Sequence, residues 1–241
     1  MDSMLKVMRQ RQETRLTRMG LAHTFSLARY RLHKCLVPLI REHAHGDALD
    51  AGSGHAPFKQ PLTLQCESVT CVDIEDRAGE IDFVADLQAM PHVADGSYDF
   101  VLCSQVLEHV PRPWDAAGEL SRVLRPGGVL VLTVPHLSAI HEAPHDYYRY
   151  TPYALRALSE RSGLDVVSIQ PSGGLWCFLL HPISYVWMTT VGSLPWIGWL
   201  GWLLNYLLLI VIGGLVDRLI GVVNQYPCDH IMVARKVDKK H

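Results

Sequence analysis

Short apolar runs alternate with stretches of helical periodicity along most of the chain. The runs are rich in Val, Ile, Leu and Phe, and several of them close on an acidic residue. Such runs predict strands, which here cover 48–50, 69–72, 83–87, 98–103, 129–134, 164–169 and 230–234. A helix is predicted to begin at Thr151-Pro152 and to end at Gly163. Strands that alternate with helices predict an α/β fold with a mainly parallel sheet covered on both faces.

The pattern changes between the last two predicted strands. Val166–Val216 is a run of 51 residues without Asp, Glu, Lys or Arg, and five of the six tryptophans lie inside it. Two apolar segments, Leu175–Val191 and Trp196–Val216, flank a turn at 192–195. About twenty helical residues span a hydrocarbon core of roughly 30 Å, so the second segment is long enough and the first is marginal.

Both ends of this insertion return to one sheet, so it crosses a membrane an even number of times or not at all. The alternatives are a hairpin through the bilayer, a re-entrant pair in one leaflet, and a buried dimerisation hairpin in a soluble protein. Interface helices of soluble dimers keep a charged outer face, and this segment has no charged residue. The composition therefore favours association with the cytoplasmic side of a membrane, and a homodimer formed through the insertion is the alternative.

Basic residues gather near the N-terminus. Residues 1–43 hold nine Lys or Arg against three acidic residues, whereas the rest of the chain is acidic. One or two helices are predicted here, with breaks near Gly20 and Pro38. They form either a solvated helical cap or a basic face that lies on anionic lipid headgroups. Nucleic acid is not expected as a partner, because the chain lacks a platform of basic and aromatic residues.

Length and cysteine usage add two expectations. A chain of 241 residues suits one large domain, or one domain with an elaboration. The six cysteines show no paired or CxxC spacing, which indicates reduced thiols in a cytosol. The N-terminal residues lack an apolar run followed by a small-residue cleavage site, so no signal peptide is expected.

A glycine-containing turn follows the first predicted strand, in the sequence Asp50-Ala51-Gly52-Ser53-Gly54. Glycine lets the backbone turn sharply and approach a ligand closely. The dinucleotide-binding pattern has a third glycine where this chain has Pro57, and no lysine stands in the phosphate-binding place of a P-loop. Asp73 closes the second strand 23 residues beyond Asp50, and its carboxylate can accept two hydrogen bonds from a ribose diol. A nucleoside ligand without phosphates therefore fits best.

Five motifs follow in order: LDAGSG at 49–54, VDI at 72–74, VADL at 84–87, YDFV with LEHV at 98–110, and LRPGG at 124–128. This series resembles the class I S-adenosylmethionine-dependent methyltransferases, in particular the broad type 11 group, and covers roughly residues 45–170. The resemblance implies a Rossmann-like, seven-stranded sheet with helices on both faces. The apolar helical hairpin then lies between the sixth and seventh strands, where this class normally has a short connection.

The resemblance also implies which residues hold S-adenosylmethionine. The expected cofactor-binding residues are Asp50, Gly52, Gly54, Asp73, Ile74, Asp86, Leu87, Ser104 and Gln105. The glycine turn would shape the pocket for the methionine end, Asp73 would bind the ribose hydroxyls and Asp86 the adenine amino group. Because a sulfonium donor is already activated, methyl transfer needs alignment more than covalent help from the protein.

The loop after the fifth strand, residues 136–150, is dense in polar and aromatic side chains. It contains a formal match to the zinc-protease pattern at His141, Glu142 and His145. Pro144 is incompatible with the helix that this pattern requires, so no metal site is expected. His141 or His145 is a candidate general base, Asp146 is the alternative base or the residue that orients it, and the loop's polar groups can instead be purely structural. The residues expected to contact the acceptor are His109, His136, Tyr147, Tyr148 and Arg149.

These observations predict four segments and one function. The segments are basic N-terminal helices (1–43), a methyltransferase core (44–172), a membrane-associated helical insertion (173–226), and the last strand with a basic tail (227–241). The expected activity is methyl transfer to an oxygen of a lipid or lipid-linked glycan at the cytoplasmic membrane face. The alternatives are a soluble sugar or small metabolite as acceptor, and a non-catalytic membrane scaffold that binds the nucleoside.

Overall fold

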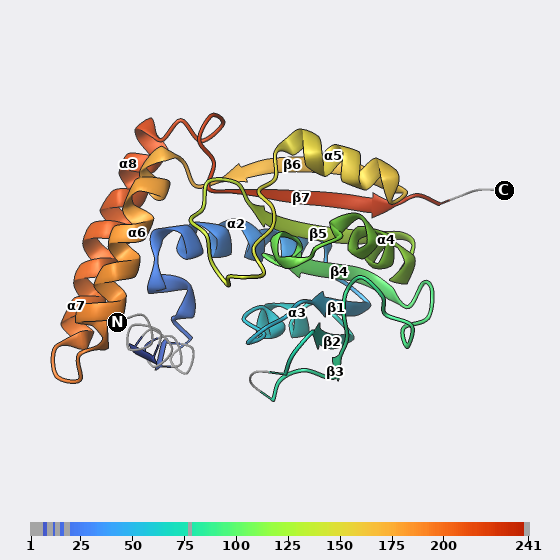
Figure 1. Cartoon of the computed structure of the whole chain (residues 1–241), viewed down its shortest axis with the longest axis horizontal. Helices are drawn as coiled ribbons and strands as arrows, with labels where there is room; N and C mark the ends of the chain where they lie inside the picture. The colour runs from blue at the N-terminus through green and yellow to red at the C-terminus, as the bar shows by residue number, and fades with distance from the viewer. Residues whose placement is uncertain (1–6, 9–11, 13–14, 17–19, 77–78, 239–241) are drawn as a thin grey trace. The chain divides into compact units, whose positions relative to one another are not determined.

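The computed structural model describes residues 7–8, 12, 15–16, 20–76 and 79–238. It contains a seven-stranded sheet in the order β3-β2-β1-β4-β5-β7-β6 (Figure 1). The strands are β1 (Asp47–Ala51), β2 (Ser68–Asp73), β3 (Phe83–Val84), β4 (Tyr98–Ser104), β5 (Leu124–Pro135), β6 (Leu164–Ser172) and β7 (Asp229–Lys236). The pairs among β1 to β5 are parallel, and β7 runs antiparallel to β5. The predicted Rossmann-like sheet is confirmed.

Alternate strand residues build the core on the two faces of the sheet. Leu49, Val101 and Leu132 share one buried cluster with residues of α4 (Pro113–Val123) and α5 (Pro152–Arg161). Phe100 and Leu102 are fully buried as well, and they point to the opposite face because successive strand side chains alternate. Burial on both faces explains why these strands appear in the sequence as continuous apolar runs.

Two helix boundaries test the sequence predictions. The α5 helix begins as predicted, because the Thr151 hydroxyl accepts a hydrogen bond from the Ala154 amide at 3.2 Å. The predicted break at Pro38 is wrong, since α2 (Leu27–His43) continues through this residue. Pro38 lies on the exposed side of the helix, whereas Leu36 and Ile40 are fully buried. Burial of two such side chains contributes about 1.5–3 kcal/mol each, which offsets the hydrogen bond that proline removes.

The chain forms two compact units. One contains residues 36–170 and 229–241, and the other combines residues 1–35, as far as they are described, with residues 171–228. The sequence places residues 1–43 and 173–226 in separate segments. They join because Leu27 packs with Cys177 and Ile210, and Phe25 packs with Met188. Most of the predicted helix before Gly20 lies outside the described residues.

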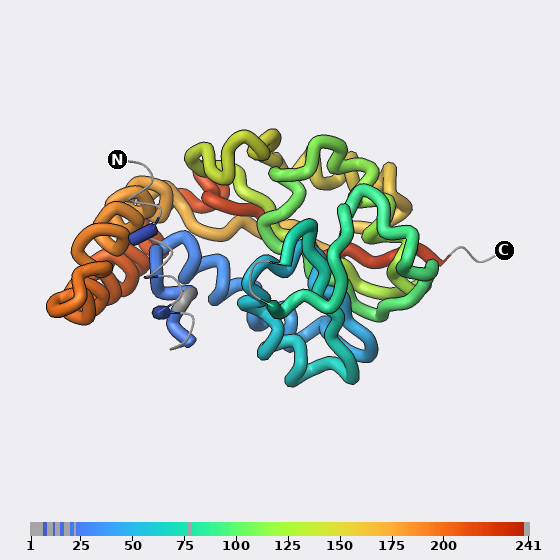
Figure 2. Tube along the Cα trace, turned by 60° about the horizontal axis from the view of Figure 1, so that its bottom comes forward, coloured from blue at the N-terminus to red at the C-terminus, as the bar shows by residue number. Residues whose placement is uncertain are grey.

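The insertion is a helical hairpin. Its first arm is α6 (Leu175–Thr190), followed by η3 (Val191–Ser193). The second arm runs without interruption through α7 (Gly198–Leu204), the π-helical η4 (Asn205–Ile212) and α8 (Gly213–Ile220). The two arms lie side by side (Figure 2). Both predicted apolar segments are therefore helical. Among the described residues, only the helix Gly198–Ile220 is long and apolar enough to cross a membrane.

Several buried polar groups of the hairpin are paired with one another and with the preceding 3-10 helix η1 (Ala22–Phe25). The Ser184 hydroxyl donates to the Asn205 side-chain oxygen at 2.6 Å, and the Asn205 amide donates to the Thr24 carbonyl at 3.3 Å. Asp217, fully buried, accepts hydrogen bonds from the Gly174 and Cys177 amides at the start of α6. The Asp217 bonds satisfy donors that the N-terminus of α6 leaves unpaired. The Asn205 bond fixes the hairpin to residues 22–25.

Candidate active site

The glycine turn follows β1 and hydrogen-bonds the end of β2. Gly52 and Gly54 adopt φ values of +76° and +56°, which favour glycine, and a Cβ atom on Gly52 would collide with the Val106 side chain. The Gly54 amide donates to a carboxylate oxygen of Asp73 at 2.8 Å. The turn therefore brings the backbone that follows the first strand against the acidic residue of the second.

Asp50, the last acidic residue before this turn, is buried, and one of its carboxylate oxygens is unpaired in the part of the chain that the structure describes. It is 2% exposed, and its Oδ2 atom has no hydrogen-bond partner among the described residues. Burial raises the pKa of Asp50 to about 7, and the negative charge of Asp73 adds to this effect. A cationic group brought by a ligand would satisfy that oxygen, so the residues present fit the positively charged methionine end of S-adenosylmethionine.

The other expected cofactor residues lie at the ends of the next strands. Asp73 is half-buried, and the neighbouring Ile74 side chain is 65% exposed. The Asp86 carboxylate is exposed and accepts hydrogen bonds from the backbone and side chain of Gln88. Leu87 is buried in the core, so only its backbone is free to contact a ligand.

Ser104 and Gln105 close β4 and contact the end of β5. The Ser104 and Thr133 hydroxyl oxygens are 2.9 Å apart, and the Gln105 side-chain amide donates to Thr133 at 3.3 Å. Gln105 has a φ of +58°, a strained conformation for a residue other than glycine. Its side chain also bonds Asp229, a buried acid at the start of β7 whose pKa burial raises to about 7. Sequence patterns missed Asp229, because it follows a long insertion and resembles an ordinary strand boundary.

The loop between β5 and α5 is not helical, as Pro144 predicts. It is tied to the 3-10 helix η2 (Leu107–His109) by a bond from the Tyr147 amide to the Glu108 carbonyl at 2.8 Å. Within the loop, both Asp146 oxygens accept from the Arg149 guanidinium at 2.6 and 2.8 Å. Arg149 holds the pKa of Asp146 well below its usual range. This arrangement favours an orienting role for Asp146 over a role as base.

The expected acceptor residues are distributed around this loop. Tyr147, Tyr148 and Arg149 line an open hollow together with Ser138, Ile140 and Asp146. The His136 ring bonds the Tyr150 carbonyl at 2.9 Å instead, and the His109 ring bonds the His145 carbonyl at 2.6 Å. The His145 side chain is exposed, with its Nδ1 atom 3.1 Å from the Tyr147 hydroxyl.

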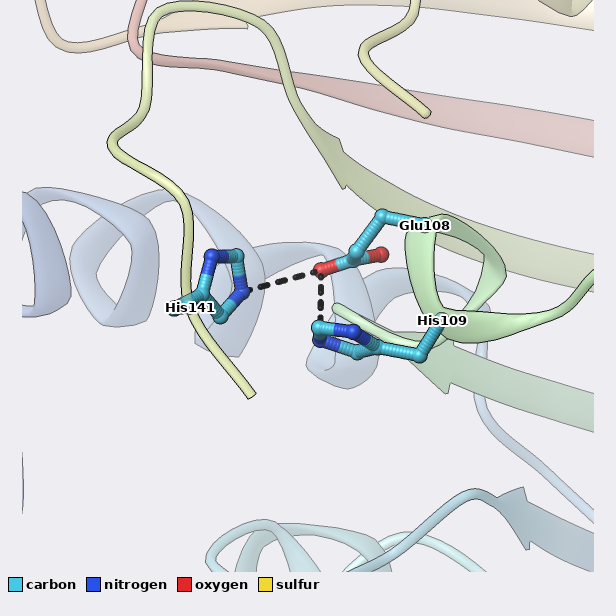
Figure 3. A group of neighbouring side chains, drawn as sticks. All are labelled: Glu108, His109 and His141. Carbon is cyan, nitrogen blue, oxygen red and sulfur yellow. Dashed lines mark ion pairs between the residues drawn. The ribbon is translucent and has the colours of Figure 1, made fainter. Parts of the chain in front are cut away.

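Glu108 is a residue that the sequence predictions did not single out. It belongs to the LEHV motif, yet its side chain is fully buried and neither carboxylate oxygen bonds another described residue. Burial raises the pKa of Glu108 to about 8. His109 and His141 lie beside it (Figure 3). A motif cannot reveal this cluster, because His141 reaches it from a loop more than thirty residues later.

Comparison with known proteins agrees with this layout of strand ends. Residues 49–132 match the family described as "Methyltransferase domain", in its type 11 form. This stretch is a class I methyltransferase domain. An uncharacterized methyltransferase of Mycolicibacterium paratuberculosis is 58% identical over an alignment that covers 35% of this chain and 37% of the relative. The chain thus spans well under half the length of the curated relatives it matches.

Solved structures extend the similarity of the methyltransferase domain to most of the fold. The cyclase SpnF has a TM-score of 0.58 at 16% identity, covering 84% of this chain and 81% of that protein. A Burkholderia thailandensis 1,6-didemethyltoxoflavin-N1-methyltransferase, solved with S-adenosylhomocysteine bound, has a TM-score of 0.53 at 17% identity and covers 86% and 78%. At these identities the likeness establishes the fold alone.

Proposed function

We propose that this protein transfers a methyl group from S-adenosylmethionine to an oxygen of a lipid or lipid-linked glycan at the cytoplasmic face of a membrane. The main support for the transferase activity is that Asp50, Asp73 and the glycine turn converge at one edge of the sheet, within a methyltransferase domain. The membrane location is supported by the apolar surface of the hairpin, which is described below.

The chain's own residues supply binding and alignment. Bound S-adenosylmethionine supplies an activated methyl group from its sulfonium and becomes a neutral thioether. Asp50 and the glycine turn would hold the positively charged methionine end, Asp73 would accept hydrogen bonds from the ribose hydroxyls, and Asp86 would bind the adenine amino group. Holding donor and acceptor in line removes much of the entropic barrier to reaction.

The proton of an acceptor hydroxyl must leave as the carbon–oxygen bond forms. His145 is suited to take it, because its exposed ring stands beside the Tyr147 hydroxyl at the rim of the hollow that Tyr148 and Arg149 also line. Imidazole titrates near neutral pH, which suits a general base. Arg149 is committed to Asp146, so this ion pair stabilises the loop that carries His145.

Exposed apolar side chains follow both arms of the hairpin at helical spacing. They are Leu179, Ile183 and Val186 on α6, and Leu204, Leu208, Val211, Leu215 and Leu219 on the second arm. Spacings of three and four residues place each set on one side of its helix. Only 22% of the most apolar window of the second arm is buried, which is unlike the core helix of a soluble protein. Contiguous exposed apolar surface of this kind marks contact with a membrane or a protein partner.

A direct test combines methyl-labelled donor with extracted membrane lipids. The wild-type protein should add the labelled methyl group to one lipid or glycolipid species, seen by mass spectrometry, and Asp73→Ala should add less of it at a donor concentration near the wild-type Kd. Label on a water-soluble sugar or metabolite would instead identify a soluble acceptor. No transfer to any fraction would favour a scaffold that binds the nucleoside without catalysis.

A second test addresses the membrane. Replacing Leu208 and Leu215 with Glu should abolish co-flotation with anionic vesicles, because both side chains are exposed and a buried charge is costly in lipid. Tyr153→Glu, at an exposed site on α5, is the matched control and should float as the wild type does. If the double Glu variant lost self-association, and the wild type did not bind vesicles, the apolar surface would be a dimer interface.

A further inference from the structure

Three potential metal ligands converge between η2 and the loop after β5. Glu108 and His109 come from η2, and His141 comes from the loop (Figure 3). The Glu108 Oε1 atom lies 3.7 Å from His109 Nε2 and 3.9 Å from His141 Nε2. One ligand atom from each residue lies within 4.8 Å of those of the other two.

Hydrogen bonds on the far side of each ring determine which nitrogen faces the carboxylate. The Nδ1 atom of His109 is 2.6 Å from the His145 carbonyl, and the Nδ1 atom of His141 is 3.1 Å from the Ala139 carbonyl. A carbonyl oxygen only accepts hydrogen bonds, so both Nδ1 atoms carry the hydrogen. In the neutral imidazole the Nε2 atom then presents a lone pair, and in both rings that lone pair is near Glu108.

When Glu108 is ionised, two imidazole lone pairs and a carboxylate oxygen therefore meet without a donor between them. Glu108 is fully buried, and neither of its oxygens bonds another described residue. An unpaired buried carboxylate is costly, and such groups are normally paired with a cation, protonated or bound to a metal. The structure thus places three acceptor atoms around one point, and a positive charge at that point would stabilise all three.

We propose that Glu108, His109 and His141 bind a divalent transition-metal ion, of the class that includes zinc, iron(II) and manganese. Imidazole and carboxylate ligands suit these metals, and both bond to zinc at about 2.0–2.2 Å, which places tetrahedral ligand atoms roughly 3.4 Å apart. The separations of 3.7 and 3.9 Å from the Glu108 oxygen need only a small closure, and the ligand nitrogens of the two histidines lie within 4.8 Å of each other. Both rings remain partly exposed, so further coordination positions face solvent.

The surroundings have the outer hydrogen bonds that metal-binding histidines normally make. Each ring bonds a backbone carbonyl through Nδ1, and the His141 Nδ1 atom is also 3.6 Å from an Asp146 oxygen. Such partners orient the ring and raise the basicity of the ligating nitrogen. Arg149 pairs with the same carboxylate, so Asp146 is held in place.

The proposed metal site is independent of the proposed methyl transfer, and binding alone tests it. The probes are Zn²⁺, followed by competition with a chromophoric chelator, and Co²⁺, followed by its visible absorption, on the full chain without a histidine tag. We expect one ion per chain, and a Co²⁺ spectrum without the near-ultraviolet band of a thiolate ligand. That spectrum separates this site from the six cysteines.

The variants Glu108→Gln, His109→Gln and His141→Gln should each weaken Zn²⁺ binding at least about tenfold. His92→Gln, at an exposed histidine outside the cluster, should bind like the wild type. Unfolding midpoints measured with excess chelator identify any variant that fails to fold. The metal affinities of the remaining variants then test the proposed site. Absence of stoichiometric binding, a thiolate band, or equal affinity in the correctly folded cluster variants would overturn the proposal.

Discussion

Asp50 and Asp73 close two neighbouring strands, and the structure gives them different surroundings. Asp50 is buried with one unsatisfied oxygen, whereas Asp73 is half-buried and accepts a bond from the Gly54 amide. The first is suited to a cationic group that enters from outside. The second remains accessible to a ligand's hydroxyl groups, so the two carboxylates have distinct tasks at one edge.

Replacing Asp73 with Ala should weaken S-adenosylmethionine binding. The substitution leaves the ribose hydroxyls and the Gly54 amide poorly paired, which costs on the order of 1–3 kcal/mol, or about 5- to 150-fold in Kd. Isothermal titration calorimetry measures the change. Glu75→Ala, at the exposed acid two residues later, is the control and should leave Kd unaltered. Unchanged affinity in Asp73→Ala would show that the ribose is held elsewhere.

Asp50 should make stability depend on pH. Its pKa is about 7 in the folded chain and near 4 when unfolded, so between these values the unfolded state releases its proton first. The free energy of unfolding should therefore fall as pH rises from about 4 to about 7. Asp50→Asn should remove this decline and be more stable than the wild type at pH 8 by roughly 1–4 kcal/mol. Urea unfolding at pH 5 and pH 8 is the measurement, and parallel curves for the two proteins would contradict it.

At the scale of elements, the loop after β5 bears several polar side chains and is held in place by hydrogen bonds. The Tyr147 amide and the Tyr150 hydroxyl bond η2, and the Asp146–Arg149 pair braces the residues between them. Because the loop is held at several points, His145 keeps a defined place beside the hollow. A role of His145 in proton transfer depends on this position in space, which the residues next to it in the sequence do not determine.

Replacing His145 with Gln should lower turnover by roughly 10²–10⁴ while leaving the donor Kd unchanged. Glutamine keeps the polarity and approximate size of the side chain but cannot take up a proton. Single-turnover assays with labelled donor give the rate, and calorimetry gives the affinity. His92→Gln should behave as the wild type. Full activity in His145→Gln would mean that alignment alone drives the reaction.

At the scale of the whole molecule, the insertion lies between two neighbouring strand ends of the sheet. The Cys228 amide donates to the Ser172 carbonyl at 3.1 Å, so the chain leaves β6 and enters β7 at adjacent points. An insertion between neighbouring strand ends can be removed without breaking the sheet. Residues 20–35 belong with the hairpin, because Phe25 and Leu27 are buried in its clusters.

A chain without residues 1–35, and with 175–224 replaced by a short Gly/Asn turn, should fold without detergent and bind S-adenosylmethionine like the wild type. Removing 175–224 alone should give an aggregating protein, since Phe25 and Leu27 lose burial worth about 1.5–3 kcal/mol each. Size-exclusion chromatography and calorimetry compare the two. If the doubly shortened chain does not fold, the hairpin is an integral part of the core.

The sequence by itself determined the features that depend on local pattern. Apolar runs and turn residues predicted the sheet, the glycines predicted the tight turn after β1, and Pro144 predicted a non-helical loop. A run of 51 residues without charge predicted the hairpin. Each of these follows from the backbone preferences and burial of residues close together in the chain.

Only the tertiary structure decided the features made by distant residues. It joined residues 20–35 to the hairpin, kept Pro38 inside a helix by burying its neighbours, and placed Asp229 against Gln105. It also brought His141 to the buried carboxylate of Glu108. Burial and through-space charge create these properties, and neither quantity is present in a stretch of sequence before the chain has folded.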